Sequence, residues 1–200
     1  MTLAAAHPAI PSLVDALVSD VFYQTILIDH VGDDARRAAL ARYMVYSLGE
    51  AERTGRVVAT DDPTIGLALW LLPRAPDVEA REHDAKHAFL VELCGPRGYD
   101  NYRRITGFML ERAEGVIPHG AWYLSILGVS PAAQGQGIGQ RLISSTMAEA
   151  EAAGATSWLE TFTTGGARFY QRAGFALVAW HEEPTTGRPY AILRRDAPGR

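Results

Sequence analysis

A glycine-rich segment between a strand-like run and a helix-like run constrains this 200-residue chain more than any other feature. The segment reads GVSPAAQGQGIGQRLI and spans residues 128–143. The run before it, residues 121–129, is apolar at nearly every position, as in a strand buried on both faces. The run after it, residues 136–153, repeats apolar residues at helical spacing and stops at Gly154. A strand, a glycine loop and a helix are therefore expected to follow one another here.

Such a loop can bind an anion. The first N–H groups of a helix lack partners within the helix, and the helix dipole adds partial positive charge there, so phosphate is the usual guest. Glycines allow close approach to the backbone, and Gln134 and Gln136 can donate amide hydrogen bonds without adding charge. The glycine order fits neither the dinucleotide G-x-G-x-x-G pattern nor a P-loop. A tight turn without a ligand is the alternative interpretation.

The rest of the chain predicts strands and helices that alternate in the C-terminal half. This order favours a mixed sheet covered by helices. Helices are expected over residues 10–22, 32–55, 77–93, 98–114 and 166–174. Strands are expected over residues 56–60, 64–72, 157–161, 175–183 and 188–195.

Charge and composition exclude several classes of protein. The net charge of −4 argues against a partner nucleic acid, because nucleic-acid binders usually carry a strong basic patch. Cys94 is the single cysteine, so neither an intrachain disulfide nor a cysteine zinc site is expected. No apolar run approaches the roughly 20 residues of a membrane span, and the N-terminus does not resemble a secretion signal. We therefore expect one cytoplasmic domain over residues 1–200, with no membrane partner.

The glycine loop and a later tyrosine segment together resemble the GNAT superfamily of N-acyltransferases. The loop follows the family pattern Arg/Gln-x-x-Gly-x-Gly/Ala, and FYQRAGF at residues 169–175 follows LET at residues 159–161. The likeness covers residues 119–195 and is greatest to the subgroup that includes puromycin N-acetyltransferase. It implies a mixed, mostly antiparallel central sheet covered by helices. The family's first strand is not evident, because HPAIPSL at residues 7–13 is short and rich in proline.

The resemblance also implies acetyl-CoA as the acetyl donor and a binding site for it. Backbone groups near Leu127 and Val129 would pair with the amides of the pantetheine arm, as a strand edge pairs with a peptide. Arg141 is either a phosphate ligand or a solvated helix residue. The pyrophosphate would contact the backbone of Gln134, Gly135, Gln136, Gly137, Ile138 and Gly139.

Two side chains are candidates for acid–base chemistry by the same resemblance. Tyr170 would protonate the leaving CoA thiolate, and the alternative is a core aromatic residue. Glu160 would accept the proton of the amine, and the alternative is a hydrogen bond to backbone; His119 is the second candidate base. Relatives often place asparagine four residues before the tyrosine. Here that residue is Gly166, and Thr163 or Thr164 is a candidate substitute.

The function implied is transfer of an acetyl group from acetyl-CoA to a primary amine of a small molecule by direct attack. A protein or peptide acetyltransferase and a non-catalytic acyl-CoA sensor are the alternatives. No metal is expected, because His83 and His87 do not form an H-E-x-x-H motif. The chain is expected to be a monomer or a homodimer. Candidates for the acceptor pocket are Tyr23, Tyr43, Tyr46 and Trp70.

Overall fold

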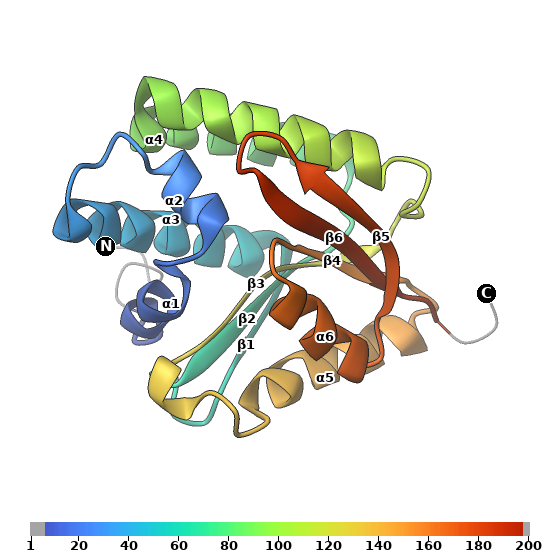
Figure 1. Ribbon diagram of the computed structural model, residues 1–200. Helices are drawn as coiled ribbons and strands as arrows, with labels where there is room; N and C mark the ends of the chain where they lie inside the picture. Colours follow the sequence, from blue (N-terminus) through green and yellow to red (C-terminus); the bar gives the residue numbers. More distant parts are fainter. Residues whose placement is uncertain (1–6, 198–200) are drawn as a thin grey trace.

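The computed structural model describes residues 7–197 and shows a six-stranded sheet with helices on both faces (Figure 1). The helices are α1 (Ile10–Leu17), α2 (Val21–Ile26), α3 (Asp33–Thr54), α4 (Pro76–Ala113), α5 (Ile138–Ala152) and α6 (Thr164–Arg172). The strands are β1 (Gly55–Ala59), β2 (Gly66–Leu71), β3 (Trp122–Val129), β4 (Ser157–Thr161), β5 (Ala176–Glu183) and β6 (Arg188–Arg195). No helix in this part of the chain is long and apolar enough to cross a membrane.

The sheet is open in its middle. Its order is β1-β2-β3-β4-β6-β5, and every neighbouring pair is antiparallel except β3 and β4. These two parallel strands share only the register pairs Trp122↔Ser157 and Tyr123↔Trp158, and beyond them the strands diverge (Figure 1). The predicted mixed, mostly antiparallel sheet is confirmed. The divergence leaves the β4-facing edge of β3 without a strand partner from residue 124 onward.

Strand β2 lies between two apolar layers. Leu67 and Leu69 belong to a core formed with α1 to α4, whereas Ala68 and Trp70 belong to a core formed with α5 and α6. All four side chains are fully buried. Because successive side chains of a strand point to opposite faces, this one strand holds both layers together.

The N-terminal region differs from the prediction in one place. The helix predicted over residues 10–22 is two helices, since Asp20 has extended backbone (ψ 133°) and its carboxylate accepts a hydrogen bond from the Phe22 N–H at 2.8 Å. An aspartate in this position begins a new helix, although the apolar periodicity continues across it. The segment 7–13 contributes to α1, and the described residues before Gly55 contain no strand.

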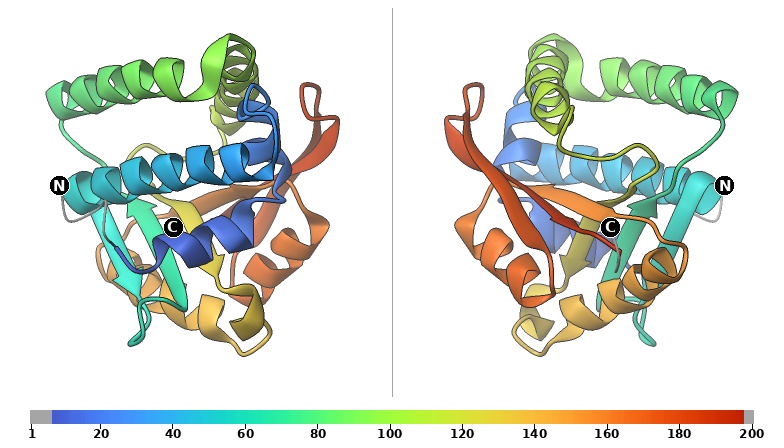
Figure 2. Two further views of the ribbon diagram at one scale, coloured as in Figure 1. Left: turned by 90° about the vertical axis from the view of Figure 1, so that its left-hand side faces the viewer. Right: turned by 90° about the vertical axis from the view of Figure 1, so that its right-hand side faces the viewer.

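Helix α4 is broken near its centre, in agreement with the two helices predicted over residues 77–93 and 98–114. Gly95 has φ 71° and Pro96 follows it, and Figure 2 shows the two parts of α4 meeting at a sharp angle. The Asp29 carboxylate accepts the Arg97 N–H at 2.9 Å, which satisfies a donor of the second part. His30 Nε2 donates to the Leu93 carbonyl at 2.7 Å, which satisfies an acceptor of the first part.

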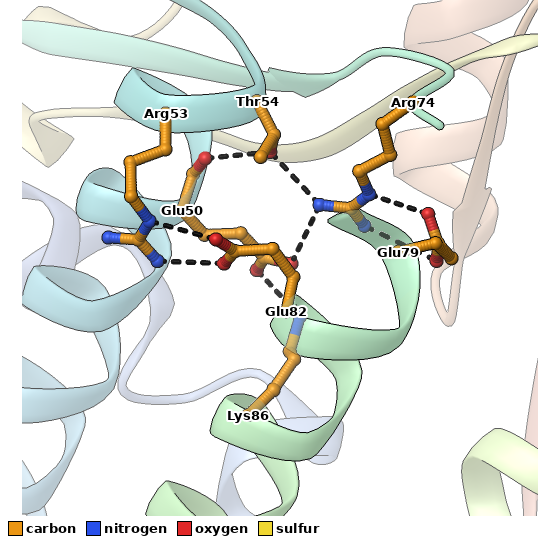
Figure 3. A network of polar contacts seen from close by, with 7 residues as sticks. All are labelled: Glu50, Arg53, Thr54, Arg74, Glu79, Glu82 and Lys86. Carbon is orange, nitrogen blue, oxygen red and sulfur yellow. Dashed lines mark hydrogen bonds and ion pairs between the residues drawn. The ribbon is translucent and has the colours of Figure 1, made fainter. Parts of the chain in front are cut away.

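A charged network fixes α3 to the first part of α4 (Figure 3). At its centre lies the Glu50 carboxylate, whose residue is 2% exposed. Lys86 Nζ lies 2.9 Å and Arg74 Nη1 lies 3.7 Å from its oxygens. A second pair, Arg53 and Glu82 at 2.8 Å, also bridges the two helices. The buried carboxylate is therefore neutralised by cations from two other segments.

Replacing this carboxylate should destabilise the fold. In Glu50→Ala, Lys86 and Arg74 lose their buried counter-charge, and we expect the free energy of unfolding to fall by about 3 kcal/mol. This is the lower end of the range for broken buried pairs, because both cations reach some solvent. Urea unfolding measures the change. The matched control is Glu92→Ala, which removes the exposed α3–α4 pair with Arg42 and should cost less than about 1 kcal/mol. Equal losses in the two variants would contradict the prediction.

Candidate active site

A cavity of about 590 Å³ opens where β3 and β4 diverge. Its walls come from the ends of α1 and α2, from α3 and α4 on one side, and from β3, β4 and α6 on the other. Strand β3 is alternately buried and half-buried, not buried on both faces as predicted, because half of its residues border this space. Aromatic side chains form much of the wall, including Phe22, Tyr23, Tyr43, Tyr102, Tyr123 and Phe162.

Glu160 lies in this wall on β4 and is held by two tyrosines. The Tyr123 hydroxyl donates to one carboxylate oxygen at 3.1 Å, and the Tyr190 hydroxyl donates to the other. Burial raises the pKa of Glu160 to about 7, although the two hydrogen bonds act in the opposite direction. Burial and the nearby carboxylate raise the pKa of both tyrosines, so they remain donors at neutral pH. A carboxylate with this pKa is suited to accept a proton near pH 7.

Tyr170 lies on α6 and lines the same cavity. Its ring packs edge-to-face against Phe169, with centroids 4.9 Å apart, and against Phe175 at 6.0 Å. Burial, with a smaller contribution from Asp20, raises the pKa of the Tyr170 hydroxyl well above its usual value. The residue thus combines a packed ring with a hydroxyl that keeps its proton at neutral pH, which a general acid requires.

The glycine loop borders a second groove, of about 460 Å³. Leu127 and Phe169 line both spaces, so the groove lies next to the large cavity. Gln136 is the exception among the predicted donor-binding residues: it does not line the groove, and its carbonyl accepts a hydrogen bond from Arg141 Nη1 at 3.1 Å. The other predicted residues all line the groove: Leu127, Val129, Gln134, Gly135, Gly137, Ile138 and Gly139.

The loop backbone requires glycine at specific positions. Gly135 has φ 79° and Gly137 has φ 74°, a left-handed conformation that side chains disfavour. A Cβ at Gly139 would lie 3.1 Å from the Phe169 ring. The Gln134 side-chain amide donates to the Val129 carbonyl at 3.1 Å, so it is engaged within the loop. The polar groups that residues 134–139 offer to the groove are therefore mainly backbone groups.

Gly166 is explained by its neighbours. A Cβ there would lie 2.6 Å from Thr161 Oγ1 and 2.8 Å from Thr163 Oγ1. The asparagine that relatives often carry does not fit this backbone without movement. Of the two candidate substitutes, Thr163 caps α6, because its hydroxyl oxygen accepts the Gly166 N–H at 3.0 Å.

The remaining candidate residues divide into those that line the cavity and those that do not. Tyr23 and Tyr43 line the cavity, whereas Trp70 is fully buried in the core and Tyr46 stacks on Phe89 outside the cavity. His119 is exposed and borders neither space. Residues 7–197 contain no group of three or more His, Cys, Asp or Glu side chains placed to hold a metal ion.

Sequence reasoning missed three residues that shape the site. Asp20 lines the cavity, and Tyr123 and Tyr190 hold Glu160. The local sequence at Asp20 carries the signal of a helix start, an aspartate before an apolar run, but nothing there indicates the cavity. The tyrosines lie 37 and 30 residues from Glu160 in the chain and meet it only through the sheet.

Comparison with known proteins agrees with this fold. The acetyltransferase (GNAT) domain family matches residues 98–177. A blasticidin-S acetyltransferase of Streptomyces morookaense is 33% identical in an alignment 117 residues long, which covers 56% of this chain and 75% of the relative. An acetyltransferase of Corynebacterium glutamicum related to histone acetyltransferases superposes over 100% of this chain and 95% of its own, with a TM-score of 0.70 and 21% identity. A polyamine N-acetyltransferase of Drosophila melanogaster covers 94% of both chains, with a TM-score of 0.60 and 13% identity.

A mixed sheet that opens between two parallel strands, with a glycine loop at a helix start, is the arrangement of the GNAT fold. The chain belongs to the GNAT acetyltransferase family, whose members use acetyl-CoA as the acetyl donor. The comparisons do not single out the puromycin N-acetyltransferase subgroup within it.

Proposed function

We propose that this acetyltransferase transfers the acetyl group of acetyl-CoA to a primary amine of a small molecule, by direct attack of the amine. The observation that carries the proposal is that two neighbouring spaces share Leu127 and Phe169 in their walls, one bordered by the glycine loop and the other by Glu160. A volume of about 590 Å³ is within the range of small-molecule sites. The antibiotic and polyamine acetyltransferases among the similar proteins support the same acceptor class.

The donor would lie along the groove. The β4-facing edge of β3 near Leu127 and Val129 has no strand partner within the described residues, so its free backbone groups can form hydrogen bonds with the amides of the pantetheine arm. The left-handed glycines Gly135 and Gly137 turn the backbone at the start of α5, where N–H groups and the helix dipole favour a pyrophosphate. The residues present therefore fit acetyl-CoA.

Glu160 and Tyr170 would carry the two proton transfers. Glu160, ionised above pH 7, accepts one proton from the ammonium group of the acceptor, and the free amine then attacks the thioester carbonyl. The nitrogen–carbon bond forms as the carbon–sulfur bond breaks, Tyr170 gives its proton to the departing sulfur, and the second proton of the nitrogen passes to solvent. Exchange with solvent then restores both side chains.

The assignment of the donor site predicts the effect of a bulky residue in the loop. Gly137→Val places two methyl groups where the backbone must approach the pyrophosphate, and we expect at least tenfold weaker binding of acetyl-CoA by calorimetry. The variant is also strained, because φ is 74°. Gly154→Val is the matched control: this glycine has φ 64° at the other end of α5, and a Cβ there meets no neighbour within 4 Å. Unchanged affinity in a folded Gly137→Val protein would contradict the assignment.

The proposed function itself is tested by acetyl transfer from acetyl-CoA to a panel of amines, scored by release of the CoA thiol. The panel contains aliphatic monoamines and diamines, puromycin-like aminonucleosides and a peptide with a free amine. We expect turnover with at least one small amine. Turnover with the peptide alone would identify a peptide acetyltransferase, and tight donor binding without any turnover would identify a sensor.

A further inference from the structure

The charge of the acceptor cavity is unbalanced. Asp20 and Glu160 are the carboxylates in its wall, and Lys86 is the one cation among the described lining residues. Lys86 already pairs with Glu50, which lies at 2.9 Å. None of the ion pairs formed within residues 7–197 includes Asp20 or Glu160. The two carboxylates in the wall thus have no ion-pair partner among residues 7–197.

Asp20 is not explained by its structural role alone. It caps α2 through the hydrogen bond from the Phe22 N–H, but asparagine or serine caps a helix about as well without bringing a charge. The residue is half-buried, and burial raises the pKa of its carboxyl despite the hydrogen bonds from backbone N–H groups. An ionised carboxylate that is half-buried and has no ion-pair partner is stabilised when a ligand places a cation beside it.

The surroundings of Asp20 also favour a cation. Phe22 and Tyr23 follow it directly, with ring centroids 5.3 Å apart, and Tyr43 lies edge-on to Tyr23 at 5.3 Å. All three rings line the cavity. Aromatic faces attract ammonium and guanidinium groups, and the attraction grows when the cation leaves water. A carboxylate beside a cluster of rings is a suitable site for an organic cation.

We propose that Asp20 binds a second cationic group of the acceptor, distinct from the amine that is acetylated, so that the enzyme selects dicationic amines. The inference rests on the proposed function, in which Glu160 serves the reacting amine. Asp20, between α1 and α2 in the cavity wall, binds the second cationic group of the same molecule. It acts as a specificity-determining residue.

Two amines of equal chain length test the assignment: 1,5-diaminopentane, a dication, and pentylamine, a monocation. The wild-type enzyme should have a lower KM for the diamine. Asp20→Asn keeps the cap and should raise the KM for the diamine about 10- to 100-fold, as expected for loss of a charge-assisted hydrogen bond. The KM for pentylamine should stay within about threefold, and any change in kcat should be the same for both amines, because the Asp20 charge also acts on the Tyr170 hydroxyl. Asp15→Asn, outside the cavity on α1, controls for the change in net charge and should alter neither KM.

Other results would overturn the proposal. Equal KM values for the two amines in the wild type, or an unchanged KM for the diamine in Asp20→Asn, would mean that Asp20 is only a cap. A similar rise in KM for both amines would place Asp20 at the reacting amine instead. If the wild type acetylates neither amine, the proposed function fails for these probes. Calorimetric binding of the diamine in the presence of CoA, which has no acetyl group to give, then decides: weaker binding to Asp20→Asn supports the site, and equal or absent binding overturns it.

Discussion

Tyr170→Phe should slow acetyl transfer on the order of ten- to a thousandfold while leaving the affinity for acetyl-CoA nearly unchanged. The substitution removes only the hydroxyl, so the ring can keep its packing against Phe169 and Phe175. The hydroxyl is expected to act on charge that develops on sulfur as the carbon–sulfur bond breaks. An interaction made mainly in the transition state lowers kcat when it is lost and has little effect on ground-state binding.

Single-turnover acetyl transfer on the purified variant measures this effect directly, because product release does not enter the rate. Tyr46→Phe is a suitable control: it removes a tyrosine hydroxyl outside the cavity, from a ring stacked on Phe89. A Tyr170→Phe rate within about twofold of wild type, with thermal stability preserved, would show that Tyr170 is a core aromatic residue and that another group serves the thiolate.

Glu160→Gln should lower kcat/KM about 10²- to 10⁴-fold at pH values above 7 and should flatten the pH profile. In the wild type, the carboxyl with a pKa of about 7 is protonated below that pH and cannot accept a proton. The rate should therefore rise with pH through about 7. Glutamine preserves the size of the side chain, and its amide oxygen can still accept from one of the two tyrosine hydroxyls, but it has no basic form.

The Glu160 carboxyl should also make the free energy of unfolding depend on pH. Its pKa is raised on folding from 4.5 to about 7, so the folded state holds the proton more tightly than the unfolded chain. The stability it contributes is complete below about pH 4.5 and is lost as the pH rises through about 7. Urea unfolding across this range should show the loss in the wild type and not in Glu160→Gln. Glu149→Gln, which alters an exposed pair with Arg56, should behave as wild type in both experiments. A wild-type pH–rate profile in Glu160→Gln would remove the residue from the mechanism.

Much of the fold and the donor site follows from local sequence. The glycine loop lies at the start of α5 as predicted, because an unbroken apolar strand, a run of glycines and a periodic helix leave little freedom. The Gly95–Pro96 pair marks the break in α4 for an equally local reason: neither residue suits a helix interior.

The acceptor side of the site could not be predicted in the same way. Tyr190 reaches Glu160 only because β6 lies beside β4, and the cavity exists only because β3 and β4 part after two register pairs. Both facts depend on how strands distant in the chain are ordered. The apolar periodicity of residues 10–22 continues through Asp20, the cap of α2. The sequence of the two short helices therefore resembles that of a single helix.

The break in α4 has a consequence for the size of molecule that the enzyme can admit. The part of α4 before Gly95 brings Lys86 to the cavity and is held to α3 by the Glu50 network; the part after it brings Tyr102 and Met109. The two parts of α4 thus form two adjoining parts of the cavity wall, set at an angle to each other. Asp29 and His30 hold this angle, because Asp29 bonds to the second part of the helix and His30 bonds to the first. The width of the cavity is therefore set by two side chains that do not line it.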